Sequence, residues 1–144
     1  MREPTVLRYI SIVYRYSQIH ISRKLKSFPI GSGQYPFILA VCRNPGISQD
    51  GISERLVIDK GTTAKAVKAL EKGGYIERRI DETDRRAYKL YVTREGRKLR
   101  DYLDRVLLEW SDCLWKDFGP EERDITYKLV ERMARNARDY VASA

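Results

Sequence analysis

Residues 48–72 read SQDGISERLVIDKGTTAKAVKALEK and contain two short helical patterns joined by a tight apolar turn. Ser48 and Asp59 stand directly before the two patterns, where a side-chain oxygen can accept a hydrogen bond from the first turn of a helix. Ile52 and Leu56 give the first predicted helix one apolar face, and residues 57–58 form the turn. This stretch therefore predicts a pair of short, capped helices.

The second of these predicted helices has one buried and one exposed face. Thr63, Val67 and Leu70 recur at helical spacing and are expected to be buried. The residues expected to face outward are Thr62, Lys65, Lys68 and Lys72. The glycine pair at 73–74 ends the helix, because glycine readily adopts the positive φ that a helix C-terminus favours. Two such helices around a tight turn are typical of a helix-turn-helix.

A β-hairpin is predicted directly after this motif. Residues 75–80 (YIERRI) and 87–92 (AYKLYV) alternate in the manner of strands, and residues 81–86 (DETDRR) between them are almost all charged. A tip with so few apolar groups does not pack into the core of its own protein. The tip is either a solvated loop or a segment that contacts another molecule. Because it follows a helix-turn-helix, it indicates a wing that helps bind duplex DNA.

Long helices are predicted on both sides of this winged unit. Apolar side chains recur at intervals of three or four residues in 3–26, and they do so again from Leu99 to Leu114 within 93–118. The last helix, which begins after Gly119, is expected to bury one stripe of side chains: Ile125, Leu129, Met133, Ala137 and Val141. The fold class is mainly α with a small β-hairpin wing, a winged helix-turn-helix domain with long N- and C-terminal dimerisation helices.

The whole chain, 1–144, reads as one domain with four segments. Residues 34–92 form the winged helix-turn-helix and 93–118 a long connecting helix, while 3–30 and 119–144 are the dimerisation helices. A central unit of about 50 residues cannot cover three long apolar stripes, so the terminal helices of two protomers are expected to interleave in a homodimer. The alternative is that the three long helices pack together as a monomeric bundle.

Composition is that of a globular cytoplasmic protein. Charged residues make up 33% and hydrophobic residues 42%, with no apolar run long enough for a membrane span and no signal peptide at the N-terminus. Cys42 and Cys113 stand alone and are expected to be buried structural thiols, the latter at the dimer interface. The net charge of +8 suits a polyanionic partner, although residues 48–86 hold nine basic and eight acidic side chains and are nearly balanced.

Catalytic and metal-binding patterns are missing from the sequence. There is no Ser-His-Asp order, no pair of carboxylates in an apolar setting and no glycine loop that would cradle a phosphate. His20 is the only histidine, and no cysteine or carboxylate stands at ligand spacing from it. We therefore expect no enzyme activity, no metal and no cofactor.

The stretch PGISQDGISERLVIDKGTTAKAVKALEKGGYIERRIDETDRRAYKLYVTREG resembles the MarR family of winged-helix transcriptional regulators. Its most specific pieces are PGISQ, IDKGT, LEKGGYIERR, DRRAYKLYVT and TREG, and the order of helices around it is similar as well. The resemblance implies an obligate homodimer that binds a short inverted repeat, usually as a repressor. It also implies a small, often phenolic or anionic, ligand that lowers DNA affinity.

The resemblance implies a role for particular residues of this sequence. The helix that begins at Lys60 matches the recognition helix, and Ser48 and Gln49 match a helix start that rests on the phosphate backbone. In the recognition helix the expected contacts to bases and phosphates are Lys60, Gly61, Thr62, Lys65 and Lys68. Arg85 and Arg86 match the arginines at the tip of the wing, which enter the minor groove, and Asp84 is expected to orient one of them.

Three positions depart from the family pattern. The family usually has an apolar β-branched residue where Thr63 stands, an alanine where Ser53 stands and an acidic residue where Gly51 stands.

An effector pocket between the long helices and the winged unit is the second implied site, and its expected lining residues are Arg15, Tyr16, Arg43 and Trp110. Aromatic residues at helical spacing are also typical of a core or a dimer interface.

A winged-helix module that contacts only other proteins is the alternative function. Salt distinguishes the two, because binding through phosphates weakens steeply as the salt concentration rises. A module for protein contacts alone would not bind DNA at any salt concentration.

Overall fold

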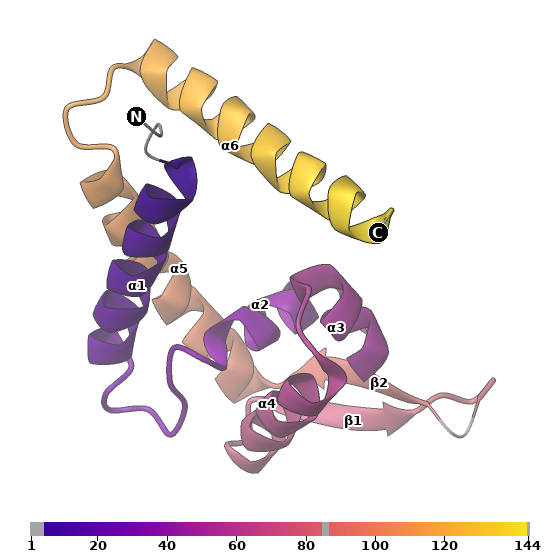
Figure 1. Ribbon diagram of the computed structural model, residues 1–144. Helices are drawn as coiled ribbons and strands as arrows, with labels where there is room; N and C mark the ends of the chain where they lie inside the picture. The colour runs from indigo at the N-terminus through magenta and orange to yellow at the C-terminus, as the bar shows by residue number, and fades with distance from the viewer. Residues whose placement is uncertain (1–4, 85–86, 144) are drawn as a thin grey trace. The chain divides into compact units, whose positions relative to one another are not determined.

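The computed structural model describes residues 5–84 and 87–143, which form six helices and one two-stranded antiparallel sheet (Figure 1). The elements in chain order are α1 (Val6–Lys24), α2 (Tyr35–Arg43), α3 (Gln49–Leu56), α4 (Lys60–Lys72), β1 (Ile76–Ile80), β2 (Tyr88–Val92), α5 (Arg94–Leu114) and α6 (Pro120–Ala142). The chain divides into two compact units, Met1–Trp110 and Ser111–Ala144. The predicted fold class, mainly α with a β-hairpin, is confirmed.

The core of the first unit is built around α2. Five consecutive residues of this helix, Phe37–Val41, are buried, because the surrounding elements cover it on most sides. Ile52 of α3 and the residues Val67 and Leu70 of α4 are fully buried in the same cluster. Leu90 brings the hairpin into this core, so the helix-turn-helix and the wing share one apolar interior.

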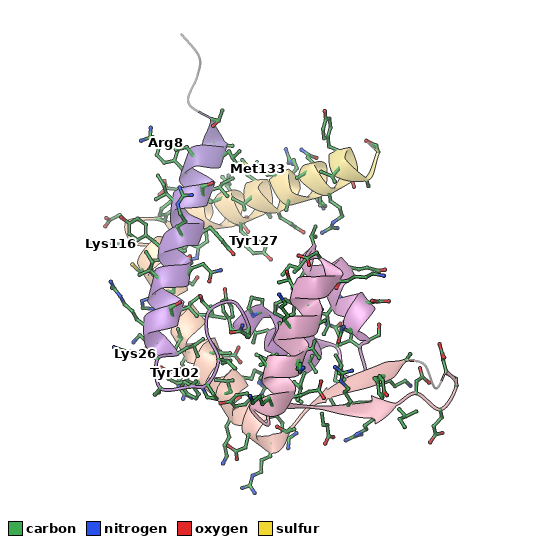
Figure 2. The ribbon with its side chains drawn as sticks, turned by 60° about the horizontal axis from the view of Figure 1, so that its bottom comes forward. Arg8, Lys26, Tyr102, Lys116, Tyr127 and Met133 are labelled. Carbon is green, nitrogen blue, oxygen red and sulfur yellow. The ribbon has the colours of Figure 1, made fainter. Side chains whose placement is uncertain are left out.

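The C-terminal half of α1 packs along α5 in the first unit. Ile21 and Leu25 are buried, and the Tyr102 hydroxyl donates to the Lys24 carbonyl at 2.7 Å. The Tyr102 side chain is labelled in Figure 2. Nearer the middle of α1, the Trp110 indole Nε1 donates to Ser17 Oγ at 2.7 Å, and the Trp110 ring stacks on His20. The N-terminal half of α1 is different, since its apolar residues Val6, Leu7, Ile10 and Val13 remain exposed in the protomer.

Two long helices are shorter than the periodicity predicted. The first begins at Val6 and ends at Lys24 rather than spanning 3–26, and residues 3–4 lie outside the described residues. The second ends at Leu114 rather than at Phe118. It ends early because residues 115–117 form a turn in which Asp117 has a left-handed φ of 65°, and Trp115 packs edge-on against Phe118 across that turn.

The apolar stripe predicted on the last helix is exposed in the protomer, and its expected cover in a dimer stays a prediction. None of the described residues of α6 is buried, and Ile125 and Val141 are 56% and 72% exposed. The helix itself begins as predicted, at Gly119-Pro120, where the Gly119 N–H donates to the Glu122 carboxylate at 2.9 Å.

The two cysteines differ from each other in exposure. Cys42 is half-buried near the end of α2, and burial is the main cause that raises the pKa of its thiol. Cys113 is exposed in the last turn of α5. The described helices include none that is both long enough and apolar enough to cross a membrane.

Val57 is the backbone outlier of the helix-turn-helix. It follows α3 with φ 55° and ψ 48°, the left-handed conformation, which a β-branched side chain adopts only at a cost. Its side chain is 80% exposed, so little burial offsets that cost. We expect Val57→Asn to raise the free energy of unfolding by about 1 kcal/mol, because asparagine tolerates this conformation. Urea denaturation at one fixed protein concentration measures the change.

Val57→Ile is the matched control for that prediction, because isoleucine keeps the branch at Cβ. The isoleucine variant should unfold at the same urea concentration as the wild type. Equal midpoints for the asparagine and isoleucine variants would show that the turn stores no strain at this position.

Candidate nucleic-acid interface

The two helices of the helix-turn-helix are capped by the residues that the sequence predicts. Ser48 Oγ accepts a hydrogen bond from the Gly51 N–H at 3.0 Å at the start of α3. Asp59 Oδ1 accepts from the Thr62 N–H at 2.8 Å at the start of α4, and Asp59 Oδ2 accepts from the Thr62 hydroxyl at 2.7 Å. These hydrogen bonds lower the pKa of Asp59, the Thr62 N–H contributing most. The carboxylate is therefore ionised at neutral pH.

The outer face of α4 carries the residues predicted to contact DNA. Thr63, Val67 and Leu70 are fully buried, which fixes the rotation of the helix about its axis. The opposite face is exposed and presents Lys60, Gly61, Thr62, Lys65, Lys68 and Lys72. Lys60 lies 3.8 Å from Asp50 of α3, an ion pair between two exposed side chains that contributes little to stability. Four lysines on one open helix face attract an anionic partner.

Ser53 and Thr63, two of the departures from the family pattern, contact each other. Ser53 Oγ donates to Thr63 Oγ1 at 2.8 Å, and Thr63 Oγ1 donates to the Asp59 carbonyl at 2.9 Å. Both residues are buried between α3 and α4. Each hydroxyl is thus satisfied inside an apolar core, where an unpaired one would cost about 1–3 kcal/mol. The pair joins the two helices of the motif at the start of α4.

The hairpin pairs Ile76 with Val92 and Ile80 with Tyr88, and arginines on both of its faces hold it in place. On one face Arg78 Nε donates to Glu71 Oε1 of α4 at 2.6 Å, and its guanidinium lies 5.3 Å from the centre of the Tyr88 ring. This ion pair is partly shielded from solvent and joins the end of α4 to β1.

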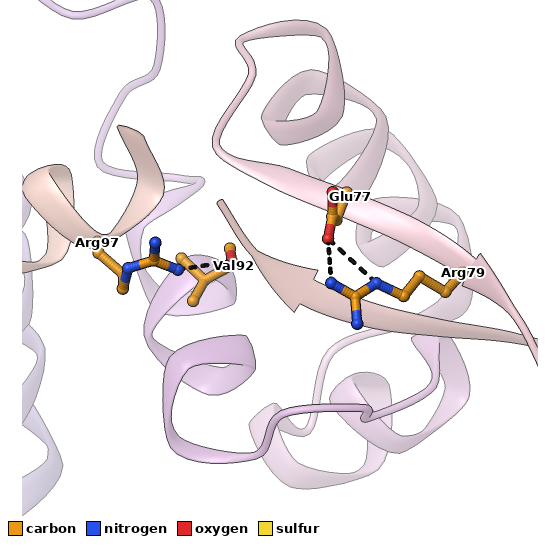
Figure 3. Close-up of polar contacts among 4 residues, drawn as sticks. All are labelled: Glu77, Arg79, Val92 and Arg97. Carbon is orange, nitrogen blue, oxygen red and sulfur yellow. Dashed lines mark hydrogen bonds and ion pairs between the residues drawn. The ribbon is translucent and has the colours of Figure 1, made fainter. Parts of the chain in front are cut away.

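The other face of the hairpin holds Arg79. Its guanidinium donates twice to Glu77 Oε1, at 2.6 and 3.1 Å (Figure 3). The same guanidinium lies 4.2 Å from the centre of the Tyr91 ring. Arg97, in the first turn of α5, donates to the Val92 carbonyl at the base of the same hairpin. Arg78 and Arg79 therefore have partners inside the protein and brace the wing.

The described tip residues Glu82, Thr83 and Asp84 are exposed, as the charged composition of the tip predicts. Asp81 accepts hydrogen bonds from the Thr83 hydroxyl at 2.7 Å and from the Thr83 N–H at 3.0 Å, and these bonds lower the pKa of Asp81. Arg85 and Arg86, the two arginines predicted to enter the minor groove, lie outside the described residues. So does the predicted contact between Asp84 and one of them.

Of the four residues predicted to line an effector pocket, two lie together along one groove. Arg15 and Tyr16 lie with Ile12 and Ile19 along a shallow groove on α1, while Arg43 and Trp110 are not among the residues that line it. Trp110 instead packs on His20. Among the residues that the structure describes, no three His, Cys, Asp or Glu side chains gather in a way that could hold a metal ion.

Known proteins resemble this chain over nearly its whole length. A sequence model of the MarR family matches residues 29–87. The crystal structure of a MarR transcriptional regulator from Methanosarcina mazei Go1 is 40% identical, covers 94% of this chain and 97% of its own, and superposes with a TM-score of 0.86. The chain belongs to the MarR family of transcriptional regulators.

Two further comparisons agree with this. An uncharacterised HTH-type regulator of Bacillus subtilis, YybA, is 29% identical over 91% of this chain and 87% of its own. A MarR-family regulator from Listeria monocytogenes, solved with a 26mer DNA, is 24% identical and has the same fold, with a TM-score of 0.90 over 95% of this chain and 91% of its own. These MarR-family relatives are regulators rather than enzymes, as the sequence predicts for this chain.

The structure adds interface residues of this MarR-family member that its sequence did not single out. Asp59 was recognised as a cap but not as the partner of the Thr62 hydroxyl. Glu71 and Arg78 were not recognised at all as the connection between recognition helix and wing. Strand alternation gave a partial signal for the role of Arg78, because it places Arg78 and Leu90 on the core side of the hairpin.

Proposed function

We propose that this transcriptional regulator acts in the cytoplasm as a homodimer that binds an inverted repeat in duplex DNA and represses transcription. The observation that carries the proposal is the outer face of α4, where Thr62, Lys65 and Lys68 are exposed opposite a fully buried face. A helix presented in this way fits the major groove, where lysine can donate to guanine and threonine can reach a base edge.

The start of α3 and the wing support the same proposal. Ser48 and Gln49 stand at the N-terminus of α3, where free backbone N–H groups and the helix dipole favour a phosphate. The hairpin is tied to α4 through Glu71 and Arg78, so both parts would meet DNA as one rigid surface. The arginines of the tip, Arg85 and Arg86, are proposed to reach the neighbouring minor groove.

The homodimer is supported by apolar side chains that one protomer leaves uncovered. On α1 these are Val6, Leu7, Ile10 and Val13, and on α6 they are Ile125, Leu129, Val130, Met133 and Val141. Patches of this extent are rare on proteins that remain monomeric. A two-fold dimer would also place two copies of α4 to read two half-sites of an inverted repeat.

A small phenolic or anionic effector that lowers DNA affinity completes the proposal. Its support is the family resemblance together with Arg15 and Tyr16, which lie side by side on the groove of α1. Arg43 and Trp110 are not included in this proposed effector site.

Fluorescence anisotropy tests DNA binding with duplexes from upstream of the protein's own gene and with a scrambled duplex, at two salt concentrations. We expect tight, salt-sensitive binding that prefers the upstream DNA. Lys65→Ala should weaken binding to the preferred duplex by about 1–3 kcal/mol and reduce the preference, because a base contact is lost. A lysine that touches only a phosphate would instead lower affinity evenly and reduce the salt slope by about 1.

Lys26→Ala is the matched control, because it removes the same charge from the loop after α1, outside the helix-turn-helix and the hairpin. It should leave the preference for the upstream duplex unchanged. A wild-type protein that binds no DNA even at low salt would contradict the proposal and support the protein-contact module.

A further inference from the structure

The hydroxyl of Thr62 already has a hydrogen-bond partner within the protein. Thr62 is the third residue of α4, its side chain is exposed, and both of its donors point to the same carboxylate. The N–H donates to Asp59 Oδ1 at 2.8 Å and the hydroxyl donates to Asp59 Oδ2 at 2.7 Å. Asp59 therefore fixes both the backbone and the side chain of Thr62.

The direction of the bond between the hydroxyl and Asp59 follows from the charge of the carboxylate. An ionised carboxylate has no proton to donate, and the pKa of Asp59 is lowered by the two bonds from Thr62. The proton that lies between the two oxygens must therefore belong to Thr62. A hydroxyl has one proton and two lone pairs, so Thr62 Oγ1 can only accept a further hydrogen bond.

We propose that Thr62 is a specificity-determining residue that accepts a hydrogen bond from adenine or cytosine in the major groove. These two bases present exocyclic amino donors there, whereas guanine and thymine present oxygen acceptors in the corresponding places. A guanine or thymine oxygen opposite Thr62 Oγ1 would face another lone pair. The inference rests on the proposed function, in which the outer face of α4 enters the major groove.

Lys65 gives the same helix face the opposite hydrogen-bonding role. It stands three residues after Thr62 on the exposed face and has donors only. The pair thus presents one acceptor and one donor, about 4.5 Å apart along the helix axis. Each half-site is expected to hold an amino-bearing base opposite Thr62 and a guanine near Lys65.

Asp59→Asn tests the inference because it reverses the hydrogen bond and leaves the cap in place. Asparagine keeps one oxygen for the Thr62 N–H and is as good an N-cap as aspartate. Its amide group replaces Oδ2 and donates to Thr62 Oγ1, so the threonine proton turns outward. The variant should prefer guanine or thymine at the position where the wild type prefers adenine or cytosine.

Selection of duplexes from a randomised library, followed by sequencing, measures these preferences for the full-length protein. The wild type should enrich adenine or cytosine about tenfold at one position of each half-site. Thr62→Val, which keeps the methyl group and loses the hydroxyl, should abolish that enrichment. Thr62→Ser keeps the hydroxyl and should retain it, which provides a second test if Asp59→Asn does not fold.

Asp104→Asn controls for the loss of one negative charge, because it lies on α5 and does not contact Thr62. It should leave the base preference unchanged. Two results would overturn this inference without affecting the proposed function. One is specific DNA binding with the same base preference in the wild type and in Asp59→Asn. The other is a preference for thymine that persists in Thr62→Val. No enriched sequence in the wild type overturns the proposed function as well.

Discussion

A protein cut after Phe118 is expected to be monomeric and to lose at least about 100-fold in affinity for an inverted repeat. The cut removes α6, of which no described residue is buried within the protomer. The proposed role of the exposed apolar side chains of α6 is to hold two chains together. Two linked DNA-binding domains bind a two-site duplex far more tightly than one domain does, typically by a factor of about 10²–10⁴.

Light scattering coupled to gel filtration gives the mass, and anisotropy with a one-site and a two-site duplex gives the affinities. The truncated protein should bind both duplexes with nearly the same weak affinity. A truncated protein that remains dimeric and keeps its affinity for the two-site duplex would show that α6 is not the interface.

A full-length variant separates loss of the interface from loss of folding. Leu129→Glu with Met133→Glu places two charges one turn apart on the exposed apolar stripe of α6. This variant should also be monomeric. Arg135→Glu is its control, because helical spacing places Arg135 on the opposite side of α6 from that stripe, and this single variant should remain dimeric.

Gly96→Ala is expected to reduce the free energy of unfolding by about 3 kcal/mol. Gly96 is buried in the first turn of α5, and a Cβ at this position would lie 2.0 Å from the Tyr75 carbonyl oxygen and 2.5 Å from Val92 Cγ2. The carbonyl oxygen belongs to the backbone and cannot rotate away. The same oxygen accepts the Thr93 N–H at 3.0 Å, so a shift of α5 would break the junction with the hairpin.

Gly33→Ala is the control for this substitution, because a Cβ at Gly33 would meet no atom within 4 Å. Its effect should stay within about 0.5 kcal/mol. Urea denaturation of both variants at equal protein concentration measures the difference. A Gly96→Ala protein as stable as Gly33→Ala would mean that α5 can move without cost.

Local features of the helix-turn-helix were predictable from the sequence, because local chemistry determines them. Ser48 and Asp59 are caps by residue type and position, and Thr63, Val67 and Leu70 are buried by spacing alone. The hairpin follows from strand alternation around a charged tip. The predicted contact residues of α4 therefore lie on its exposed face, whereas Ser48 and Gln49 at the start of α3 are half-buried.

Features that depend on long-range contacts were not predictable. A stripe of apolar residues has the same spacing whether its cover comes from the same chain or from another one, so the exposure of α6 could not be read from periodicity. Arg78 and Arg79 look like free basic residues in the sequence, and only the fold brings Glu71, Tyr88 and Tyr91 to them. The end of α5 depended on the backbone of Asp117, which no spacing rule identifies.

The buried contact between Ser53 and Thr63 has a consequence for protein engineering. A designer who replaces residues 60–72 with the recognition helix of a relative would import an apolar residue at position 63 and leave the Ser53 hydroxyl without its acceptor. The chimera would then read its new operator poorly for a reason that lies outside the exchanged segment. Ser53 must be exchanged for alanine together with the recognition helix. The shortest segment that can transfer DNA specificity between relatives therefore begins in α3.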